Sequence, residues 1–252
     1  MDKSKLSDGE RVQLIGQLKK TPGIRVGCEA SCRRFIGAVL WMLRSGAQWQ
    51  LLPDRLGYWN SVFKRFASWS RFDVWDKMLA HVSTKAELDN VCIDSAVVRS
   101  YAYAAGAANS HAVAEALGRS RGGFSCKIHA LTDALGLPVR FILTGGQAAD
   151  ITQATPLMKD IGRTDALLAD KGCDADILLD WLGQRETTAV ISPKANRKAK
   201  RSCDWYMYKE RHVIECRFGK LKYFRRIATW YEKKASHFME MLAFAAVLLW
   251  LR

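Results

Sequence analysis

The stretch VCIDS, residues 91–95, decides the fold class that the sequence predicts. Three apolar residues fill a short strand, and Asp94 is the first polar side chain after them. The stretch LLADKG, residues 167–172, repeats this pattern with Asp170. A carboxylate that follows an apolar strand lies at the edge of a sheet, where the ligands of α/β proteins gather. We therefore expect Asp94 and Asp170 to end two strands of one sheet.

Strand and helix patterns alternate around these two stretches. We expect further strands at residues 124–131, 138–144 and 188–192. We expect helices at residues 150–161, 174–185, 204–219 and 235–251. This order predicts an α/β fold, with a mixed sheet flanked by helices.

The chain before residue 88 has helical periodicity instead. We expect helices from Asp8 to the Thr-Pro-Gly stop at residues 21–23, and at residues 29–45, 59–69 and 73–81. Aromatic residues three and four positions apart between Trp59 and Trp75 favour a packed core over a base-stacking surface. The sequence predicts a small helical, helix-turn-helix-like domain over residues 1–86 and an α/β domain over residues 87–252.

Composition and charge exclude several classes of protein. The 252 residues are 49% hydrophobic and 25% charged, which excludes a disordered or collagen-like chain. Seven cysteines with no C-x-x-C pair argue against a disulfide framework and a zinc ribbon. The apolar run at residues 241–251 is too short to span a membrane and predicts a buried helix. With no signal peptide visible, we expect a cytoplasmic protein that does not bind membranes.

The net charge of +14 is unevenly distributed. Residues 91–192 are slightly acidic, whereas the segments on either side are basic. Such a distribution fits carboxylates that hold a metal ion beside a nucleic-acid backbone. It also fits a protein whose solvated helices are rich in lysine.

Four residues near the C-terminal end form a spaced motif, Tyr208, Arg211, Glu215 and Lys222. The motif resembles the Y-R-E-K signature of bacterial insertion-sequence DDE transposases. Further stretches that are similar to this family lie at residues 93–95, 118–123, 127–133, 169–172 and 224–229. The resemblance covers nearly the whole chain. It implies that residues 1–86 form a DNA-binding domain and residues 87–252 an RNase H-like DDE catalytic domain.

The resemblance also implies a catalytic and metal-binding triad of Asp94, Asp170 and Glu215. Two Mg²⁺ ions are the expected cofactors, with Mn²⁺ as a substitute, because Mg²⁺ prefers oxygen ligands and a metal pair activates both oxygens of a phosphoryl transfer. Taken alone, each aspartate could instead cap a turn, and Glu215 could form a surface ion pair. Glu210, five residues before Glu215, is the nearest alternative carboxylate and faces another side of the helix.

The expected partner is double-stranded DNA, both the terminal inverted repeats of the element and the target. Tyr208, Arg211 and Lys222 are expected to support the triad or to contact the terminal DNA. Phosphate contacts are expected from the basic residues Lys194, Arg197, Lys198, Lys200, Arg201, Arg225, Arg226, Arg119 and Arg121. A solvated basic loop is the alternative for residues 193–203. Joining two DNA ends implies a homodimer or a larger assembly.

The resemblance implies a transposase that cleaves DNA at the ends of its element and transfers the 3′-OH into target DNA. A metal-dependent nuclease that cuts without joining would carry the same triad. A catalytically silent DNA-binding protein is the third possibility. A bacterial transposase is expected in the cytoplasm, associated with the nucleoid.

Overall fold

The computed structural model describes residues 6–101, 104, 116–120, 123–199 and 201–252. The chain divides into two compact units. The helical unit comprises Met1–Thr84, Arg99–Glu115 and Leu221–Arg252. The sheet unit comprises Lys85–Val98 and Ala116–Lys220. The predicted functional division near residue 86 stays a prediction, but the compact helical unit takes in residues from both ends of the chain.

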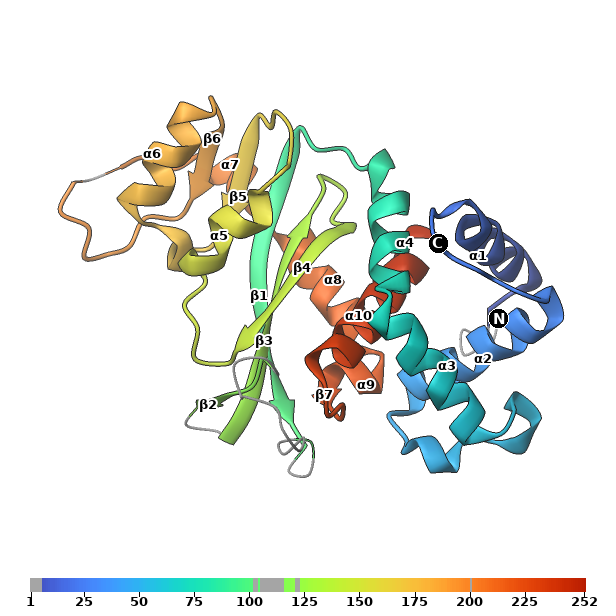
Figure 1. Ribbon diagram of the computed structural model, residues 1–252. Coiled ribbons are helices and arrows are strands. Elements are labelled where there is room, and N and C mark those ends of the chain that lie inside the picture. Colours follow the sequence, from blue (N-terminus) through green and yellow to red (C-terminus); the bar gives the residue numbers. More distant parts are fainter. Residues whose placement is uncertain (1–5, 102–103, 105–115, 121–122, 200) are drawn as a thin grey trace. The chain divides into compact units, whose positions relative to one another are not determined.

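The sheet unit contains a mixed sheet (Figure 1). Its described strands are β1 (Asn90–Ser100), β2 (Gly118–Ser120), β3 (Gly123–Thr132), β4 (Pro138–Gly145), β5 (Ala166–Ala169) and β6 (Thr188–Ile191). The strand order is β2-β3-β1-β5-β6, with β4 antiparallel to β3 and β1, β5 and β6 mutually parallel. The last two residues of β1 pair with β7 (Thr229–Trp230), within the helical unit.

The parallel register aligns the ends of two central strands. Ile93 in β1 lies opposite Ala169 in β5, which is the last residue of its strand. The expectation that Asp94 ends its own strand is wrong, because β1 continues to Ser100. The sheet edge near Asp94 arises instead because β5 ends at Ala169, one residue before Asp170, whereas β1 continues.

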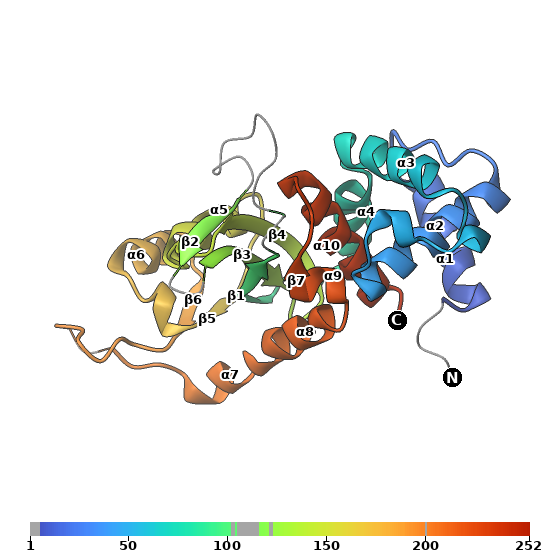
Figure 2. The same cartoon turned by 90° about the horizontal axis from the view of Figure 1, so that it is seen from below.

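Apolar side chains cover one face of this sheet. Val91, Ile93, Leu167 and Ala169 are buried in one cluster with residues of α5 and α6. Two helices supply the other side of that cluster, α5 (Ile151–Met158) and α6 (Asp176–Gln184). Figure 2 shows α7 (Trp205–Lys209) and the adjoining α8 (His212–Lys222) on the opposite side of the sheet. Alternate residues of β1 therefore face two different sets of helices.

The expected single helix over residues 204–219 is wrong, because α7 and α8 are separate. Between them, the Glu210 and Arg211 amides bond to the carbonyls three residues earlier, at 3.0 and 3.1 Å. These tight turns end α7 and let α8 begin at His212. Tyr208 and Glu215 thus lie on different helices, with Arg211 at the break.

The described part of the helical unit is built mainly from α-helices. Its helices are α1 (Asp8–Lys20), α2 (Glu29–Ser45), α3 (Trp59–Arg71), α4 (Val74–Val82), α9 (Arg225–Ala228) and α10 (Ala235–Trp250). Ser7 and Glu10 form a reciprocal capping box at the start of α1, and Gly46 ends α2 at φ 64°. Both signals lie in the sequence, and the predicted bounds of these two helices are confirmed.

The core of the helical unit lies around α10. Phe238 and every residue from Glu240 to Leu248 are buried. Trp75 of α4 packs on Phe244 with ring centroids 4.2 Å apart. The expected aromatic core is confirmed at Trp75, whereas Phe72 is 60% exposed. In the described part of the chain, no helix is long and apolar enough to cross a membrane.

These observations confirm the predicted fold class. A mixed α/β sheet carries helices on its faces, and a helical region precedes it. The order β4-β3-β1-β5-β6 is the arrangement expected of an RNase H-like sheet. The short β2 lies beside the start of β3 and extends this sheet.

Candidate active site

Asp94 and Asp170 are brought together by the strand register. Asp94 lies two residues after the buried Cys92 in β1, and Asp170 lies two residues after the buried Leu168 in β5. Cys92 and Leu168 are paired in the strand register. Because side chains of a strand alternate, Asp94 shares a face with Cys92, and Asp170 follows Leu168 at the same spacing. The two carboxylates therefore leave neighbouring strands at the same level.

Arg211 joins the third carboxylate to the first. Its Nη1 donates to Asp94 Oδ2 at 3.0 Å, and its Nη2 donates to Glu215 Oε1. The side chains of Arg211 and Asp94 are only 16% and 20% exposed, whereas that of Glu215 is 55% exposed. The break between α7 and α8 thus lets one guanidinium bridge a buried and an open carboxylate.

The electrostatics of the site are dominated by burial. Burial raises the pKa of Asp94, although the Ser95 amide and the Arg211 guanidinium act in the other direction. Glu215 and Asp170 raise it further, because their negative charges lie close. Burial would lower the pKa of Arg211, but the carboxylates of Asp94 and Glu215 outweigh it and raise that pKa. The three acidic groups therefore form one interacting set that contains a single bridging cation.

The donor set suits a hard divalent cation. Carboxylate oxygens such as those of Asp94, Asp170 and Glu215 are the ligands that Mg²⁺ and Mn²⁺ accept. Among the described residues, however, no group of three acidic, histidine or cysteine side chains is arranged to hold a metal ion. The guanidinium of Arg211 lies between Asp94 and Glu215 and balances their charge. The three residues fit a metal ion chemically, and Arg211 holds two of them, Asp94 and Glu215, in this structure.

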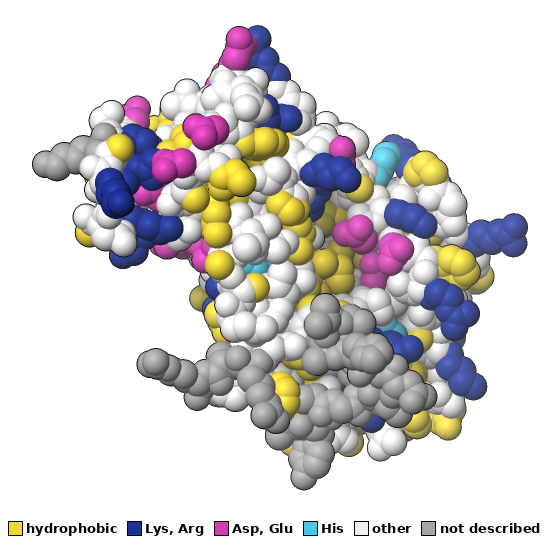
Figure 3. Space-filling model, turned by 60° about the vertical axis from the view of Figure 1, so that its left-hand side comes forward, with side chains coloured by type: hydrophobic (Ala, Val, Ile, Leu, Met, Phe, Trp, Pro, Cys, Tyr) yellow, Lys and Arg dark blue, Asp and Glu magenta, His cyan; other side chains and the backbone are white. Residues whose placement is uncertain are grey.

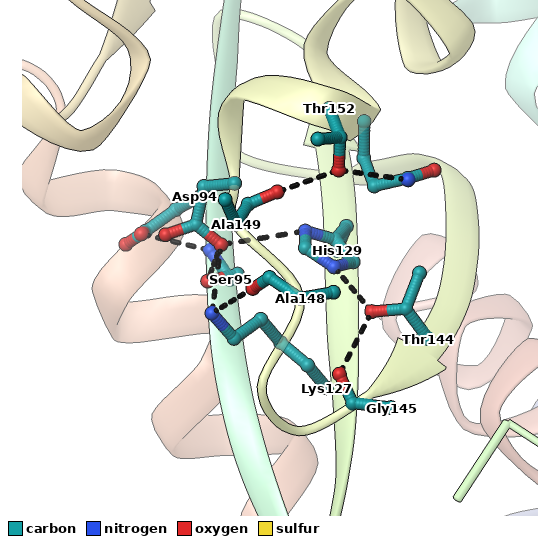
Figure 4. A network of polar contacts seen from close by, with 11 residues as sticks. Asp94, Ser95, Lys127, His129, Thr144, Gly145, Ala148, Ala149 and Thr152 are labelled. Atoms are coloured by element: carbon teal, nitrogen blue, oxygen red, sulfur yellow. Dashed lines mark hydrogen bonds and ion pairs between the residues drawn. The ribbon is translucent and has the colours of Figure 1, made fainter. Parts of the chain in front are cut away.

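A second polar network lies beside Asp94, around Asp150 (Figure 4). Ser95 Oγ donates to Asp150 Oδ1 at 2.6 Å, and Lys127 Nζ donates to the same atom at 3.2 Å. Lys127 also donates to the Ala148 carbonyl at 2.7 Å. Asp150 directly precedes α5, so the network ties β1 and β3 to the start of that helix. Sequence reasoning missed it, although the alternation that turns Asp94 one way turns Ser95 the other way.

His129 belongs to this network as a structural residue. The ring is buried, and its Nε2 lies 2.8 Å from Thr144 Oγ1. Its Nδ1 lies 3.5 Å from Asp150 Oδ1. Burial lowers the pKa of His129 to about 4, so the ring is neutral at neutral pH. A neutral, hydrogen-bonded imidazole supports its neighbours without adding charge to the site.

The other signature residues lie near Arg211 or further along α8. The ring of Tyr208 is 5.7 Å from the Arg211 guanidinium carbon and packs edge-on against Trp205. Lys222 is exposed at the last position of α8, where the dipole of a helix favours a cation. Glu210 is exposed at the end of α7 and is not bonded to Arg211, unlike Glu215.

Most of the basic loop at residues 193–201 is held by one buried carboxylate, Asp174. The Lys194 amide donates to Asp174 Oδ2 at 2.8 Å, and Arg197 Nη1 donates to Oδ1 at 2.8 Å. Arg201 contacts the same oxygen at 3.4 Å. Burial would raise the pKa of Asp174, but the Lys194 amide and the two guanidinium groups hold it below its usual value. This loop is neither freely solvated nor an open row of cations.

The loop's charges are therefore partly neutralised. Arg197 also bonds to Asp176, which lies in the first turn of α6. In Figure 3, basic side chains alternate with acidic ones at the upper left of the view instead of forming an unbroken basic surface. Lys198 is exposed and has no ion pair among the described residues. Sequence reasoning missed the role of Asp174, for which the only signal was a carboxylate twenty residues before a basic run.

The remaining expected DNA contacts differ in exposure. Arg225 is exposed at the start of α9. Arg226 is 3% exposed, its Nε bonds to Glu232 at 2.5 Å and its Nη1 bonds to the Ala47 carbonyl. This buried ion pair does not fit the expected phosphate contact of Arg226. Three expected contacts lie outside the described side chains: Lys200, Arg121 and the side chain of Arg119.

The sheet order and the paired edge carboxylates define an RNase H-like domain of the kind that carries out phosphoryl transfer on nucleic acids. Comparison with known proteins assigns the chain more closely. The family described as "Transposase DDE domain" matches residues 87–250, and the one described as "Putative transposase of IS4/5 family" matches residues 12–79. The chain belongs to the DDE transposase family of bacterial insertion sequences, whose members cut and join DNA in transposition.

Individual relatives agree with this assignment. The "Putative transposase for insertion sequence element IS6501" of Brucella ovis is 40% identical over 127 residues, which are 50% of this chain and 98% of that relative. The "Putative transposase for insertion sequence element IS402" of Burkholderia cepacia is 32% identical over 120 residues, 43% of this chain and 54% of that relative.

Solved structures give only a distant match. The Mos1 mariner paired end complex with Mn covers 88% of this chain and 94% of its own, at 13% identity and a TM-score of 0.29. The Mos1 strand transfer complex gives a TM-score of 0.28, also at 13% identity, over 84% of this chain and 91% of its own. Similarity at this level carries no argument about the fold or the function of the chain.

Proposed function

We propose that Asp94, Asp170 and Glu215 are the catalytic, metal-holding residues of a Mg²⁺-dependent transposase. The enzyme would cleave DNA at the ends of its insertion sequence and transfer the freed 3′-OH into target DNA. One observation carries this proposal. The register sets Asp94 beside Asp170, and Arg211 bridges Asp94 to Glu215.

Each carboxylate has a distinct part in the proposal. Bound Mg²⁺, for which Mn²⁺ can substitute, would supply the Lewis acid that activates the attacking oxygen and stabilises the leaving oxygen. Asp94 neighbours Asp170 through the strand register and shares Arg211 with Glu215, so it would ligate the metal together with either of them. Asp170 and Glu215 would supply the remaining carboxylate oxygens. Water is the attacking group for cleavage, and a DNA 3′-OH is the attacking group for joining.

Arg211 balances the charges of Asp94 and Glu215 in this structure. A bound cation would supply that charge instead, and the guanidinium could then bind a DNA phosphate with two parallel hydrogen bonds. Tyr208 limits where the guanidinium can turn, because the two side chains are in contact. Tyr208 and Arg211 would thus act together to keep the charge at the site balanced.

DNA contacts are proposed for the exposed cations first. Lys198, Lys222 and Arg225 are exposed and can reach a phosphate without leaving a carboxylate. Lys194, Arg197 and Arg201 would contact DNA as a loop shaped by Asp174. Arg119, Arg121 and Lys200 stay in the proposal as the remaining basic contacts. Arg226 would act indirectly, by holding the segment that carries Arg225.

The two predicted regions divide the work. Residues 1–86 would recognise the terminal inverted repeats, and residues 87–252 would carry out the chemistry. Since two DNA ends must be held together before joining, we propose a homodimer or a larger assembly on DNA. Its substrate would place it with the nucleoid in the bacterial cytoplasm.

The test is strand transfer on DNA that carries the element's own ends, with Mg²⁺ supplied or withheld. We expect Asp94→Asn, Asp170→Asn and Glu215→Gln each to abolish cutting and joining, while DNA binding remains. The matched control is Glu210→Gln, which removes a carboxylate five residues from Glu215 and should keep full activity.

Three results would contradict parts of this proposal. Cutting without joining by the unchanged protein would favour the nuclease. Specific DNA binding with neither activity, unaffected by Asp94→Asn, would favour a silent DNA-binding protein. Activity that survives Glu215→Gln but not Glu210→Gln would move the third ligand to Glu210.

A further inference from the structure

A pocket of about 560 Å³ lies in the helical unit. It lies among α1, α2, the short 3-10 helix at Asp54–Leu56 and α9. α2 contacts both α1 and α9, and Figure 2 shows these helices together. The volume is that of a site for one small ligand. Of its lining residues, the proposed function uses only Arg225, as a phosphate contact.

Four arginines line this pocket, and no acidic side chain does: Arg11, Arg44, Arg55 and Arg225. Arg11 lies 3.6 Å from Asp8, whose side chain is 90% exposed, so this pair is weak. Within the described residues, neither Arg55 nor Arg225 forms an ion pair. Four guanidinium groups around one cavity repel each other, and a phosphate group would relieve that repulsion through paired hydrogen bonds.

Apart from Ser45, the rest of the lining is apolar. Trp41 is half-buried, and Leu6 and Leu40 are buried beside it. Gly37 leaves its part of the wall without a side chain, and a Cβ there would meet only Leu56, at 3.8 Å. An inorganic anion gains nothing from an indole and leucine surface. A flat base joined to a phosphate can use both parts, because bases stack on aromatic rings in nucleic-acid-binding proteins.

We propose that this pocket binds one unpaired nucleotide of a DNA strand, with its base against Trp41 and its phosphate held by Arg55 and Arg225. The inference deepens the proposed function and rests on it, since DNA is the polymer that the enzyme would act on. A nucleotide can enter from a single-stranded end or after it leaves the duplex. The shared chemistry, a base and a phosphate, is also that of a free mononucleotide.

The test measures binding of the full chain to a fluorescent, single-stranded oligodeoxynucleotide by polarisation, without divalent metal. We expect Arg55→Gln, Arg225→Gln and Trp41→Leu each to weaken binding about tenfold. Arg34→Gln is the matched control, because Arg34 is an exposed arginine of α2 outside the pocket. Melting temperatures check that the variants fold, and Gly37→Leu gives a second variant that should block the pocket sterically.

Competitors separate the possible ligands. A mononucleotide should displace the oligonucleotide, whereas a nucleoside or inorganic phosphate alone should do so at least tenfold less well. A duplex with an unpaired end should bind more tightly than a blunt duplex of equal length. Equal effects of Arg34→Gln and Arg55→Gln, displacement by phosphate alone, or no preference for unpaired ends would overturn the inference.

Strand transfer is measured separately with the same variants. If the unchanged protein joins DNA ends but the pocket variants bind single strands normally, the inference fails and the proposed function stands. If the unchanged protein joins no ends but the pocket variants lose oligonucleotide binding, the proposed function fails and the pocket assignment stands.

Discussion

Arg211 decides the charge balance of the candidate site. Asp94 and Glu215 share its guanidinium and are held close without a metal ion. A metal ion that binds these carboxylates would have to compete with Arg211. Removing the guanidinium leaves Asp94 buried without its positively charged partner. Stability and metal affinity should therefore respond to this residue in opposite directions.

We expect Arg211→Gln to lower the free energy of unfolding by about 1–3 kcal/mol in EDTA, because a buried carboxylate loses a charged hydrogen bond. Excess Mg²⁺ should then raise the melting temperature of this variant more than that of the unchanged protein, since no guanidinium competes. Arg217→Gln is the control, because Arg217 bonds to the Leu135 carbonyl and not to the triad. Equal Mg²⁺ shifts in all three proteins would contradict this interpretation of Arg211.

Asp150 has a different task at the same scale. It accepts from Ser95 and Lys127, so it fixes the strand residue that follows Asp94. We expect Asp150→Ala to cost about 2–3 kcal/mol of unfolding free energy and Lys127→Met to cost a similar amount. The double variant should cost less than the sum by more than about 0.5 kcal/mol, because the two side chains are in contact.

Urea unfolding of the four proteins measures this coupling. Asp150→Asn is the milder control, because its amide oxygen can still accept from Ser95 Oγ. Additive costs within about 0.3 kcal/mol would mean that Lys127 and Asp150 act independently.

At the scale of elements, α4 is capped from outside its own sequence. Asp73 precedes it without a side-chain cap, and Glu240 of α10 accepts from the Trp75 and Asp76 amides at 2.9 and 3.3 Å. Burial raises the pKa of Glu240 from an ordinary value of 4.5 to about 8. Glu240 is therefore protonated in the folded protein at neutral pH, where the unfolded chain would carry it ionised.

This difference gives a pH dependence with a definite sign. Between pH 4.5 and 8 the folded state holds one proton more than the unfolded state, so the stability contributed by Glu240 falls as pH rises. This loss of unfolding free energy is a few kcal/mol at most, because each unit of pKa difference between the folded and unfolded states corresponds to about 1.4 kcal/mol. We expect Glu240→Gln to flatten the fall in melting temperature between pH 5 and pH 8.5. The control is Glu210→Gln, and parallel curves for the two variants would contradict the role of Glu240.

The elements differ in how far their sequence could predict them. The bounds of α1 and α2 were predictable, because Ser7, Glu10 and Gly46 carry local signals. The length of β1 was not, since its second half depends on partners far away in the chain. The break between α7 and α8 at Glu210 and Arg211 was not predictable, because no glycine or proline marks it in the sequence. The carboxylate pair followed from strand register, whereas the task of Asp174 depended on how a loop folds back.

For the whole molecule, net charge predicts how DNA binding responds to salt. A chain with a formal charge of +14 should bind DNA with a steep dependence on salt concentration. Removing one side chain that neutralises a phosphate should reduce the slope of log K against log[salt] by about 0.9. We expect this reduction for Lys198→Gln, Lys222→Gln and Arg225→Gln on duplex DNA.

Arg163→Gln removes one charge from an exposed position outside the proposed contacts and serves as the control. Titrations at several salt concentrations measure the slopes. The same reduction in Arg163→Gln as in the other variants would show that net charge alone, and not contact, controls binding.

The helical unit joins residues before Thr84 to residues after Lys220, and its core is completed by α10. During synthesis, α1 to α4 leave the ribosome long before the helix that buries Trp75 exists. The sheet unit lies between these two parts of the chain, so it can finish folding first. A polypeptide whose translation stops before Ala235 would thus have its edge carboxylates in position while the helices that are proposed to read DNA still lack a closed core.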